Sequence, residues 1–215
     1  MKTPLRHQAY EIIKKKIITL ELKPGDSISE AGLKEEFSLG RTPVREALLM
    51  LEQERLVECR RNIGYQVRKL SISEASDFFA LRKCLELFSA PLIIERITPQ
   101  QISEAERILD RAAVSTKASD VMGIAKCNSD FHRLLYEATA SEAFIESLSS
   151  LMSKINWLIA IAIQGGSVDA LADHHRILAA IKRKDLSGLE KEMTYHLEQA
   201  SSRYRAAAEL FCKSE

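Results

Sequence analysis

The sequence predicts a mainly α-helical fold in two domains. We expect a small N-terminal domain of helices with one β-hairpin at residues 1–70, followed by an all-α antiparallel helical bundle at residues 71–215. Three observations lead to this prediction. The 215 residues are enough for two small domains. Strand character is confined to short stretches before residue 70, and every later stretch has helical periodicity.

The distribution of charge supports a division near residue 70. Residues 1–70 contain 14 Lys and Arg against 10 Asp and Glu, whereas residues 71–215 contain 17 against 20. The net charges are therefore +4 and −3. A basic N-terminal part and an acidic remainder suit one domain that meets phosphate and another that does not.

The N-terminal domain begins with two helices. Apolar residues at helical spacing predict an amphipathic helix over Leu5–Leu20, whose lysines are most simply a solvated face. The turn Lys23-Pro24-Gly25-Asp26 ends this helix, and Ser27-Ile28 suits a very short strand. Ser29 is a good cap for a second helix that runs to Phe37.

Residues 38–51 combine a short turn, a helix start and two forward-pointing cations. We expect Thr42 to cap the helix and Pro43 to take its first position, where the missing N–H costs nothing. Arg41 and Arg45 then lie at the N-terminal end, where the helix dipole and free amides favour a phosphate. This arrangement is typical of a DNA-recognition helix, which reads base edges with its N-terminal residues. The spacing also predicts one buried stripe, made of Val44, Ala47, Leu48 and Leu51.

A β-hairpin is predicted after this helix. Residues 56–59 and 65–68 have strand character, and the tip between them holds Arg60, Arg61 and Gly64, a glycine able to adopt φ > 0. Such a wing would bring its arginines to DNA. Arginines at a hairpin tip are also often only solubilising, so both interpretations stay open.

These segments resemble the N-terminal winged helix-turn-helix of GntR-family bacterial transcription regulators. The resemblance covers about residues 5–69, and it rests on Lys23-Pro24-Gly25-Asp26, on Leu-Gly-Arg-Thr-Pro-Val-Arg-Glu-Ala-Leu at residues 39–48, on Leu51-Glu52 and on Arg55-Leu56-Val57. It implies a double-stranded DNA operator as partner, with contacts from Arg41, Thr42, Arg45 and the wing glycine Gly64, and Arg60 and Arg61 are candidate contacts beside that glycine. The family usually has Ser or Thr where this chain has Gly40, so Gly40 is not expected to contact phosphate.

Six helical stretches follow, and they can bury a core only as an antiparallel bundle. Pro91 lies inside the first stretch and should kink or split it. Thr98-Pro99-Gln100-Gln101 has a capping-box pattern at the start of the second. The expected stretches are Ser73–Glu95, Pro99–Ser115, Asp120–Ala138, Glu142–Gln164, Val168–Lys184 and Leu186–Cys212, with Gly165-Gly166-Ser167 as one of the breaks.

Cysteine usage and hydropathy predict a soluble cytoplasmic protein. The four cysteines are scattered without Cys-x-x-Cys spacing, which is typical of reduced thiols and not of a disulfide frame or a zinc knuckle. The longest apolar run, Trp157 to Ile163, is far too short to cross a bilayer, so no membrane partner is expected.

Polar residues in the bundle form a candidate metal site. Asn128 and His132 are four residues apart and share one helix face, while His174 and His196 lie on two later helices. Four such residues on three helices of one bundle can converge on a metal ion. A histidine on a helix is more often structural or exposed, so the spacing alone leaves both interpretations open.

Three segments resemble the FCD ligand-binding domain of the FadR-like branch of the GntR family. They are residues 128–133 (Asn-Ser-Asp-Phe-His-Arg), residues 173–181 (Asp-His-His-Arg-Ile-Leu-Ala-Ala-Ile) and residues 193–197 (Met-Thr-Tyr-His-Leu). In metal-binding members these positions supply one carboxylate and three imidazoles. The resemblance therefore implies a divalent transition metal, zinc or nickel-like, held by Asn128, His132, His174 and His196. Asn128 stands where Asp is common, so metal affinity should fall and a metal-free site stays an alternative.

Residues 79–86 resemble the opening helix of that domain, in which an Arg faces the effector pocket. This implies that Arg82 binds the effector, since a guanidinium suits a carboxylate. The alternative is an ion pair between Arg82 and Glu86, four residues on.

The expected function is that of a homodimeric transcription regulator and not of an enzyme. Winged helices would bind an inverted-repeat operator, and the bundle would dimerise and bind a small carboxylate, with repression or activation left open. Two alternatives remain. The bundle could serve only for dimerisation, with structural histidines, or the same cluster could serve a metal-dependent enzyme. The enzyme is the weaker alternative because no residue stands out as a general base beside the metal.

Overall fold

The computed structural model describes residues 4–61, 64–69, 71–164 and 170–212. The chain divides into two compact units, Met1–Ser71 and Ile72–Glu215. Among the described residues, no helix is both long and apolar enough to cross a membrane.

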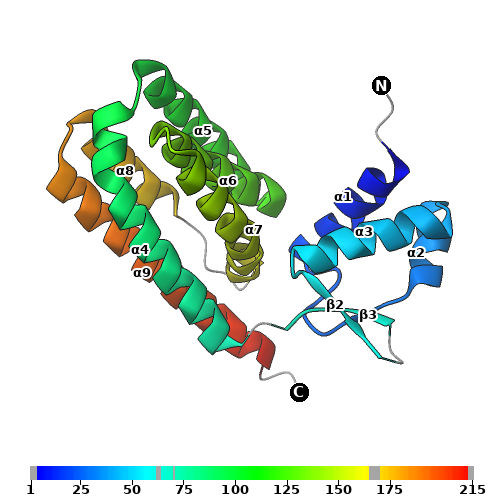
Figure 1. Cartoon of the computed structure of the whole chain (residues 1–215). Helices are drawn as coiled ribbons and strands as arrows, with labels where there is room; N and C mark the ends of the chain where they lie inside the picture. Colours follow the sequence, from blue (N-terminus) through cyan, green and yellow to red (C-terminus); the bar gives the residue numbers. More distant parts are fainter. Residues whose placement is uncertain (1–3, 62–63, 70, 165–169, 213–215) are drawn as a thin grey trace. The chain divides into compact units, whose positions relative to one another are not determined.

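The described residues of the first unit form three helices and a small antiparallel sheet (Figure 1). The helices are α1 (Leu5–Ile18), α2 (Glu30–Phe37) and α3 (Arg41–Gln53), and the strands are β1 (Ser27–Ile28), β2 (Val57–Arg60) and β3 (Gly64–Val67). The strand order is β1-β3-β2. Helix α1 packs against α3, and the core between them includes the fully buried Ile13, Ile17, Leu48 and Leu51.

Local sequence fixes the turn between α2 and α3. The Ser29 hydroxyl accepts a hydrogen bond from the Gly32 amide, which confirms Ser29 as the cap of α2. Ser38 ends α2 in the left-handed conformation, with φ of 51°. Three residues later α3 begins, so these helices form the predicted helix-turn-helix.

The predicted start of α3 was wrong by two residues. The helix begins at Arg41, its N-cap is Gly40, and no side chain caps it. Thr42 therefore does not cap α3, and Pro43 is the third helical residue instead of the first. Both are compatible with the helix because the amides of the first turn have no helical partner, so the missing N–H of Pro43 leaves no bond broken.

The wing is a two-stranded hairpin held to β1. Arg60 pairs with Gly64 in the β2–β3 register, while Ser27 pairs with Gln66 on the other side of β3. Gly64 has φ of 90°, a conformation that side chains disfavour. Because Arg60 ends β2, only Arg61 of the two wing arginines belongs to the tip; Asn62 and Ile63 lie outside the described residues.

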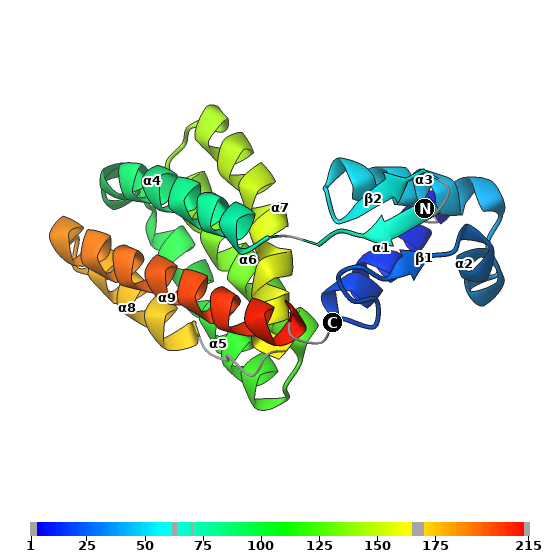
Figure 2. The ribbon, with the colours of Figure 1, turned by 90° about the horizontal axis from the view of Figure 1, so that it is seen from below.

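The second unit is an all-α bundle (Figures 1 and 2). Its helices are α4 (Ile72–Arg96), α5 (Pro99–Lys117), α6 (Val121–Ala138), α7 (Glu142–Gln164), α8 (Leu171–Lys182) and α9 (Leu186–Cys212). Helix α4 lies along α9, α5 along α6, and α8 along α9. The helices agree with the predicted stretches to within three residues at each end, and both the break expected at residues 165–167 and the expected helix start at Val168 lie outside the described residues.

Two details of the bundle test the helix-end predictions. Thr98 and Gln101 form the expected capping box at the start of α5. Pro91 does not split α4, which runs through it as one helix. Pro91 is exposed while its neighbours Ala90 and Ile93 are fully buried, so packing of the inner face maintains the helix across the lost hydrogen bond.

Candidate functional site

The N-terminal end of α3 presents three polar side chains to solvent. Arg41, Thr42 and Arg45 are all exposed, while Val44 between them is fully buried and fixes the orientation of the helix. The Arg41 side chain is 84% exposed, and its only ion-pair contact among the described residues is 3.8 Å from Nε to a Glu30 carboxylate oxygen. These cations stand where the helix dipole already favours an anion.

The wing arginines differ from one another. Arg60 forms an ion pair with Glu58 across 2.7 Å, at about half exposure of the arginine, so its charge is partly compensated. Arg61 is exposed, and Gly64 has open space where a Cβ would lie. The wing backbone can therefore approach a flat surface closely at Gly64.

In the helical unit, three histidines predicted from distant positions meet in the core. His132 on α6, His174 on α8 and His196 on α9 are each at most 4% exposed. One ring nitrogen from each lies within 4.8 Å of the other two. The ring of Phe131, also on α6, stacks against His174 with 4.6 Å between centroids, which holds that imidazole in place.

These imidazoles are held in the neutral form. Burial, with the nearby Arg82 charge, keeps the pKa of His132 and of His174 well below the usual value, and burial lowers the pKa of His196. Nε2 of His174 and Nε2 of His196 are buried without a hydrogen-bond partner in the described protein. Buried ring nitrogens normally have partners, so these two are the nitrogens of the cluster that can accept a ligand without breaking a hydrogen bond within the described protein.

The residues present fit a divalent metal ion. Neutral imidazole nitrogens are the ligands that zinc and nickel commonly take, and two of the three residues offer unpartnered nitrogens. Asn128 lies one turn before His132 on α6 and is only 6% exposed, so it belongs to the same buried face. An amide oxygen there could complete a four-ligand set but brings no charge.

Arg82 is at the same cluster and already has partners. Its Nε donates to Glu86 Oε1 at 2.6 Å, and its Nη2 lies 2.7 Å from His132 Nε2, which accepts because a guanidinium only donates. The side chains of Arg82 and Glu86 are 0% and 1% exposed. The ion pair with Glu86, which the sequence offered as the alternative role of Arg82, is thus present, and the same guanidinium contacts His132; effector binding by Arg82 stays a prediction.

Two further residues support the cluster, and neither was predicted to do so. The Tyr136 hydroxyl donates to Glu86 Oε1 at 2.5 Å. The Asp173 carboxylate lies 3.5 Å from His196 Nδ1 and 3.5 Å from Arg203, and it also pairs with Arg176. The sequence did carry a signal, because Tyr136 follows His132 by one turn and Asp173 directly precedes His174.

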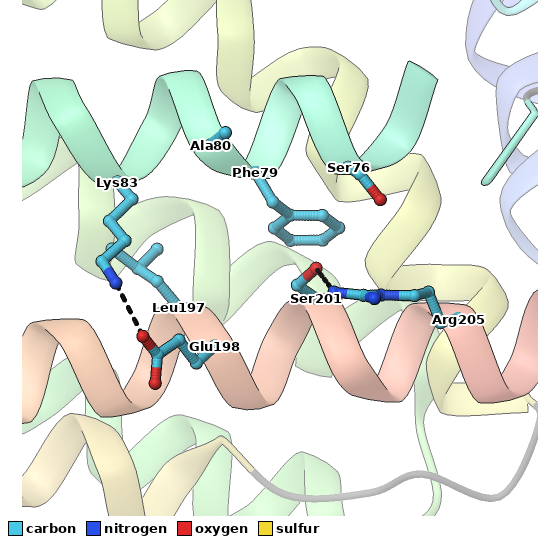
Figure 3. Close-up of a pocket in the computed structure, with 8 residues that line it drawn as sticks. All are labelled: Ser76, Phe79, Ala80, Lys83, Leu197, Glu198, Ser201 and Arg205. Atoms are coloured by element: carbon cyan, nitrogen blue, oxygen red, sulfur yellow. Dashed lines mark hydrogen bonds and ion pairs between the residues drawn. The ribbon is translucent and has the colours of Figure 1, made fainter. Parts of the chain in front are cut away.

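A surface groove of about 220 Å³ between α4 and α9 is a separate feature (Figure 3). Phe79 points into it from α4, and an ion pair of 2.6 Å between Lys83 and Glu198 crosses it. Its lining includes neither Arg82 nor any of the three histidines. The predicted effector residue therefore belongs to the buried cluster and not to this groove.

Comparison with known families assigns both units. Residues 5–67 match the family described as bacterial regulatory proteins, gntR family, and residues 77–199 match the FCD domain. The HTH-type transcriptional repressor RspR of Escherichia coli K12 is 24% identical, over 94% of this chain and 90% of that protein. The Uxu operon transcriptional regulator of the same organism is 28% identical, over 89% and 83%.

Solved structures share the fold. McbR/YncC of E. coli superposes with a TM-score of 0.74 at 23% identity, covering 92% of this chain and 95% of that one. A GntR regulator from Rhodococcus sp. RHA1, described as putative, superposes with a TM-score of 0.78 at 21% identity, covering 93% and 96%.

Proposed function

Because this chain belongs to the GntR family of transcription regulators and carries an FCD domain, we propose that it binds an inverted-repeat operator as a homodimer and responds to a small carboxylate bound beside a divalent metal. In this proposal α3 enters the major groove end-on, with Arg41, Thr42 and Arg45 as contacts. The wing approaches the adjacent DNA backbone or minor groove with Arg61 and Gly64 and, less directly, with Arg60.

The observation that supports DNA reading is the exposure of the cations at the start of α3. No ion pair holds Arg45 within the part of the chain that the structure describes, so its guanidinium can make a bidentate contact to a guanine edge. The neighbouring Arg41 is the better placed for phosphate, since it precedes the first free amides of the helix.

We expect Arg45→Ala to lose about 1–3 kcal/mol of operator binding and to relax sequence preference at one base pair. Lys15→Ala removes the same charge from the exposed face of α1 and should leave sequence preference unchanged. The measurement is a titration of purified protein with operator and scrambled duplexes at fixed moderate salt. Equal behaviour of the two variants would reject Arg45 as a base reader.

The observation that supports a metal is the pair of buried, unpartnered histidine nitrogens. When a metal is bound, His132, His174 and His196 would hold it, with the Asn128 amide as a neutral fourth ligand, and it would supply a Lewis-acidic centre for an oxygen of the effector. Arg82 would orient the effector through its buried guanidinium.

The metal content of the purified protein tests the proposed metal site. We expect His174→Ala to lose zinc or nickel, because it removes one of three imidazoles, and His175→Ala, its exposed neighbour, to retain it. The measurements are elemental analysis and titration with a chromophoric chelator. Absence of metal from the unsubstituted protein after exposure to both ions would instead support structural histidines.

An apolar stripe on α4 supports the homodimer. Phe78, Leu81, Leu85, Phe88 and Leu92 recur at alternating spacings of three and four, the pattern that pairs one helix with another. Leu81 is 51% exposed and Phe88 68% exposed, and the Phe88 ring stacks on Phe144 of α7. A stripe of this kind is self-complementary under a two-fold axis, so a second α4 is the partner that it fits.

A further inference from the structure

Two of the arginines expected at DNA have a carboxylate of the same chain beside them. Arg41 Nε lies 3.8 Å from a carboxylate oxygen of Glu30, and Arg60 Nη2 lies 2.7 Å from Oε1 of Glu58. The first pair joins α3 to α2, whereas the second lies within strand β2. Arg45 differs from both, because it forms no ion pair with any residue that the structure describes.

The Glu30 carboxylate is held at this place by its own helix. Glu30 is the first residue of α2, directly after the cap Ser29, and the helix dipole favours a negative charge there. Its side chain is 29% exposed, whereas that of Arg41 is 84% exposed. The arginine can therefore turn to another anion in solution, while the carboxylate remains beside the start of α3.

The wing repeats this arrangement in a strand. Glu58 and Arg60 lie two residues apart on β2, so their side chains project from the same face. The Nε of Arg60 also donates to Glu58 Oε1, at 2.8 Å, so one carboxylate oxygen accepts from two nitrogens of the guanidinium. These donors must leave Glu58 before they can contact a phosphate.

Both ion pairs affect DNA binding more than they affect folding. Exposed ion pairs contribute little to stability, so each can open when DNA arrives. A cation that binds duplex DNA releases roughly 0.9 of a counterion for each phosphate that it neutralises. A carboxylate that loses its arginine to a phosphate lies next to the DNA, repels it and takes up a cation from solution. The net gain from that contact is therefore small.

We propose that two carboxylates, those of Glu30 and Glu58, limit the sequence-independent part of DNA binding by competing with phosphate for their partner arginines. Base reading by Arg45 is left unopposed. The inference rests on the proposed operator binding and deepens it. Phosphate contacts carry no sequence information, so the limit applies equally to every duplex. It keeps operator affinity within the range that an effector can reverse, because coupling between two sites typically changes affinity by only about 5–150-fold.

The test measures the binding of Glu30→Gln and of Glu58→Gln to two duplexes of equal length over a range of salt concentrations. One duplex is selected from a random library by the unsubstituted chain, and the other is its scrambled version. We expect each variant to bind both duplexes roughly 5-fold more tightly at physiological salt. The slope of log affinity against log salt should steepen by about 0.9, and the preference between the duplexes should stay the same.

Glu35→Gln is the matched control, because it makes the same change in net charge at an exposed position of α2. It should leave the affinity for both duplexes and the salt slope nearly unchanged. Thermal unfolding of all three variants should match that of the unsubstituted protein, since the ion pairs are exposed. An effect of Glu35→Gln equal to that of Glu30→Gln would show that net charge alone acts, and it would overturn the proposal.

Two other results would also overturn it. The first is an unchanged affinity of Glu30→Gln and Glu58→Gln for the scrambled duplex. The second is a loss of affinity confined to the selected duplex, which would make the carboxylate a base reader or a support for one. Failure of the proposed function is distinct, because the unsubstituted chain would then prefer no duplex from the library over its scrambled version.

Discussion

Loss of the buried ion pair between Arg82 and Glu86 should destabilise the helical unit strongly. Glu86→Ala leaves an arginine in the core without its carboxylate, which typically costs about 3–5 kcal/mol of unfolding free energy. Glu198→Ala removes the partner of Lys83 at the surface, where such pairs contribute about 0–1 kcal/mol. Urea unfolding of both variants makes the comparison, and similar midpoints would show that the buried pair is not structural.

Individual site residues could be predicted from the sequence where the residue type serves few roles in proteins. Histidines spaced along three helices, and arginines at a helix start, were identified from the sequence, and the structure brings the three histidines together. Tyr136 and Asp173 were missed because tyrosine and aspartate serve many roles. Which of them reaches a neighbouring helix depends on packing that periodicity does not describe.

At the scale of elements, the two helices of the DNA-binding motif start in different ways. Ser29→Ala should cost about 1 kcal/mol of stability because the hydroxyl caps α2. Thr42→Ala should leave stability nearly unchanged, since Gly40 and not Thr42 is the N-cap of α3, and should weaken operator binding. Thermal unfolding with a parallel DNA titration separates these outcomes, and a stability loss for Thr42→Ala equal to that for Ser29→Ala would contradict the assigned cap.

Element positions followed from the sequence more closely than element ends did. The apolar spacing located each helix, because every helix must bury one face. The start of α3 and the continuity of α4 through Pro91 differed from the prediction for one reason. A capping residue or a proline changes the free energy of a helix end by about 1–3 kcal/mol. Packing of buried residues such as Val44 and Ile93 outweighs that local effect.

At the scale of the whole molecule, operator recognition should depend on the α4 stripe. The double variant Leu81→Glu with Phe88→Glu places charge in the proposed two-fold contact and should yield monomers. Its operator affinity should fall on the order of 10²-fold, because the second half-site no longer binds as part of one molecule. Sedimentation and DNA titration provide the two measurements.

Val114→Glu is the matched control for this variant, since Val114 on α5 is as exposed as Phe88, at 68%. It should remain dimeric. A double variant that also stays dimeric would exclude this stripe as the interface.

The strand order of the small sheet limits how the hairpin can be exchanged between relatives. Strand β3 lies between β2 and β1, and the Gly25 amide also donates to the Val67 carbonyl at 2.8 Å. The hairpin is thus anchored by a segment that precedes the whole helix-turn-helix in the gene. A chimera that imports the hairpin of a relative without the matching Lys23–Ile28 segment would mispair at this edge, so specificity grafts should exchange the two pieces together.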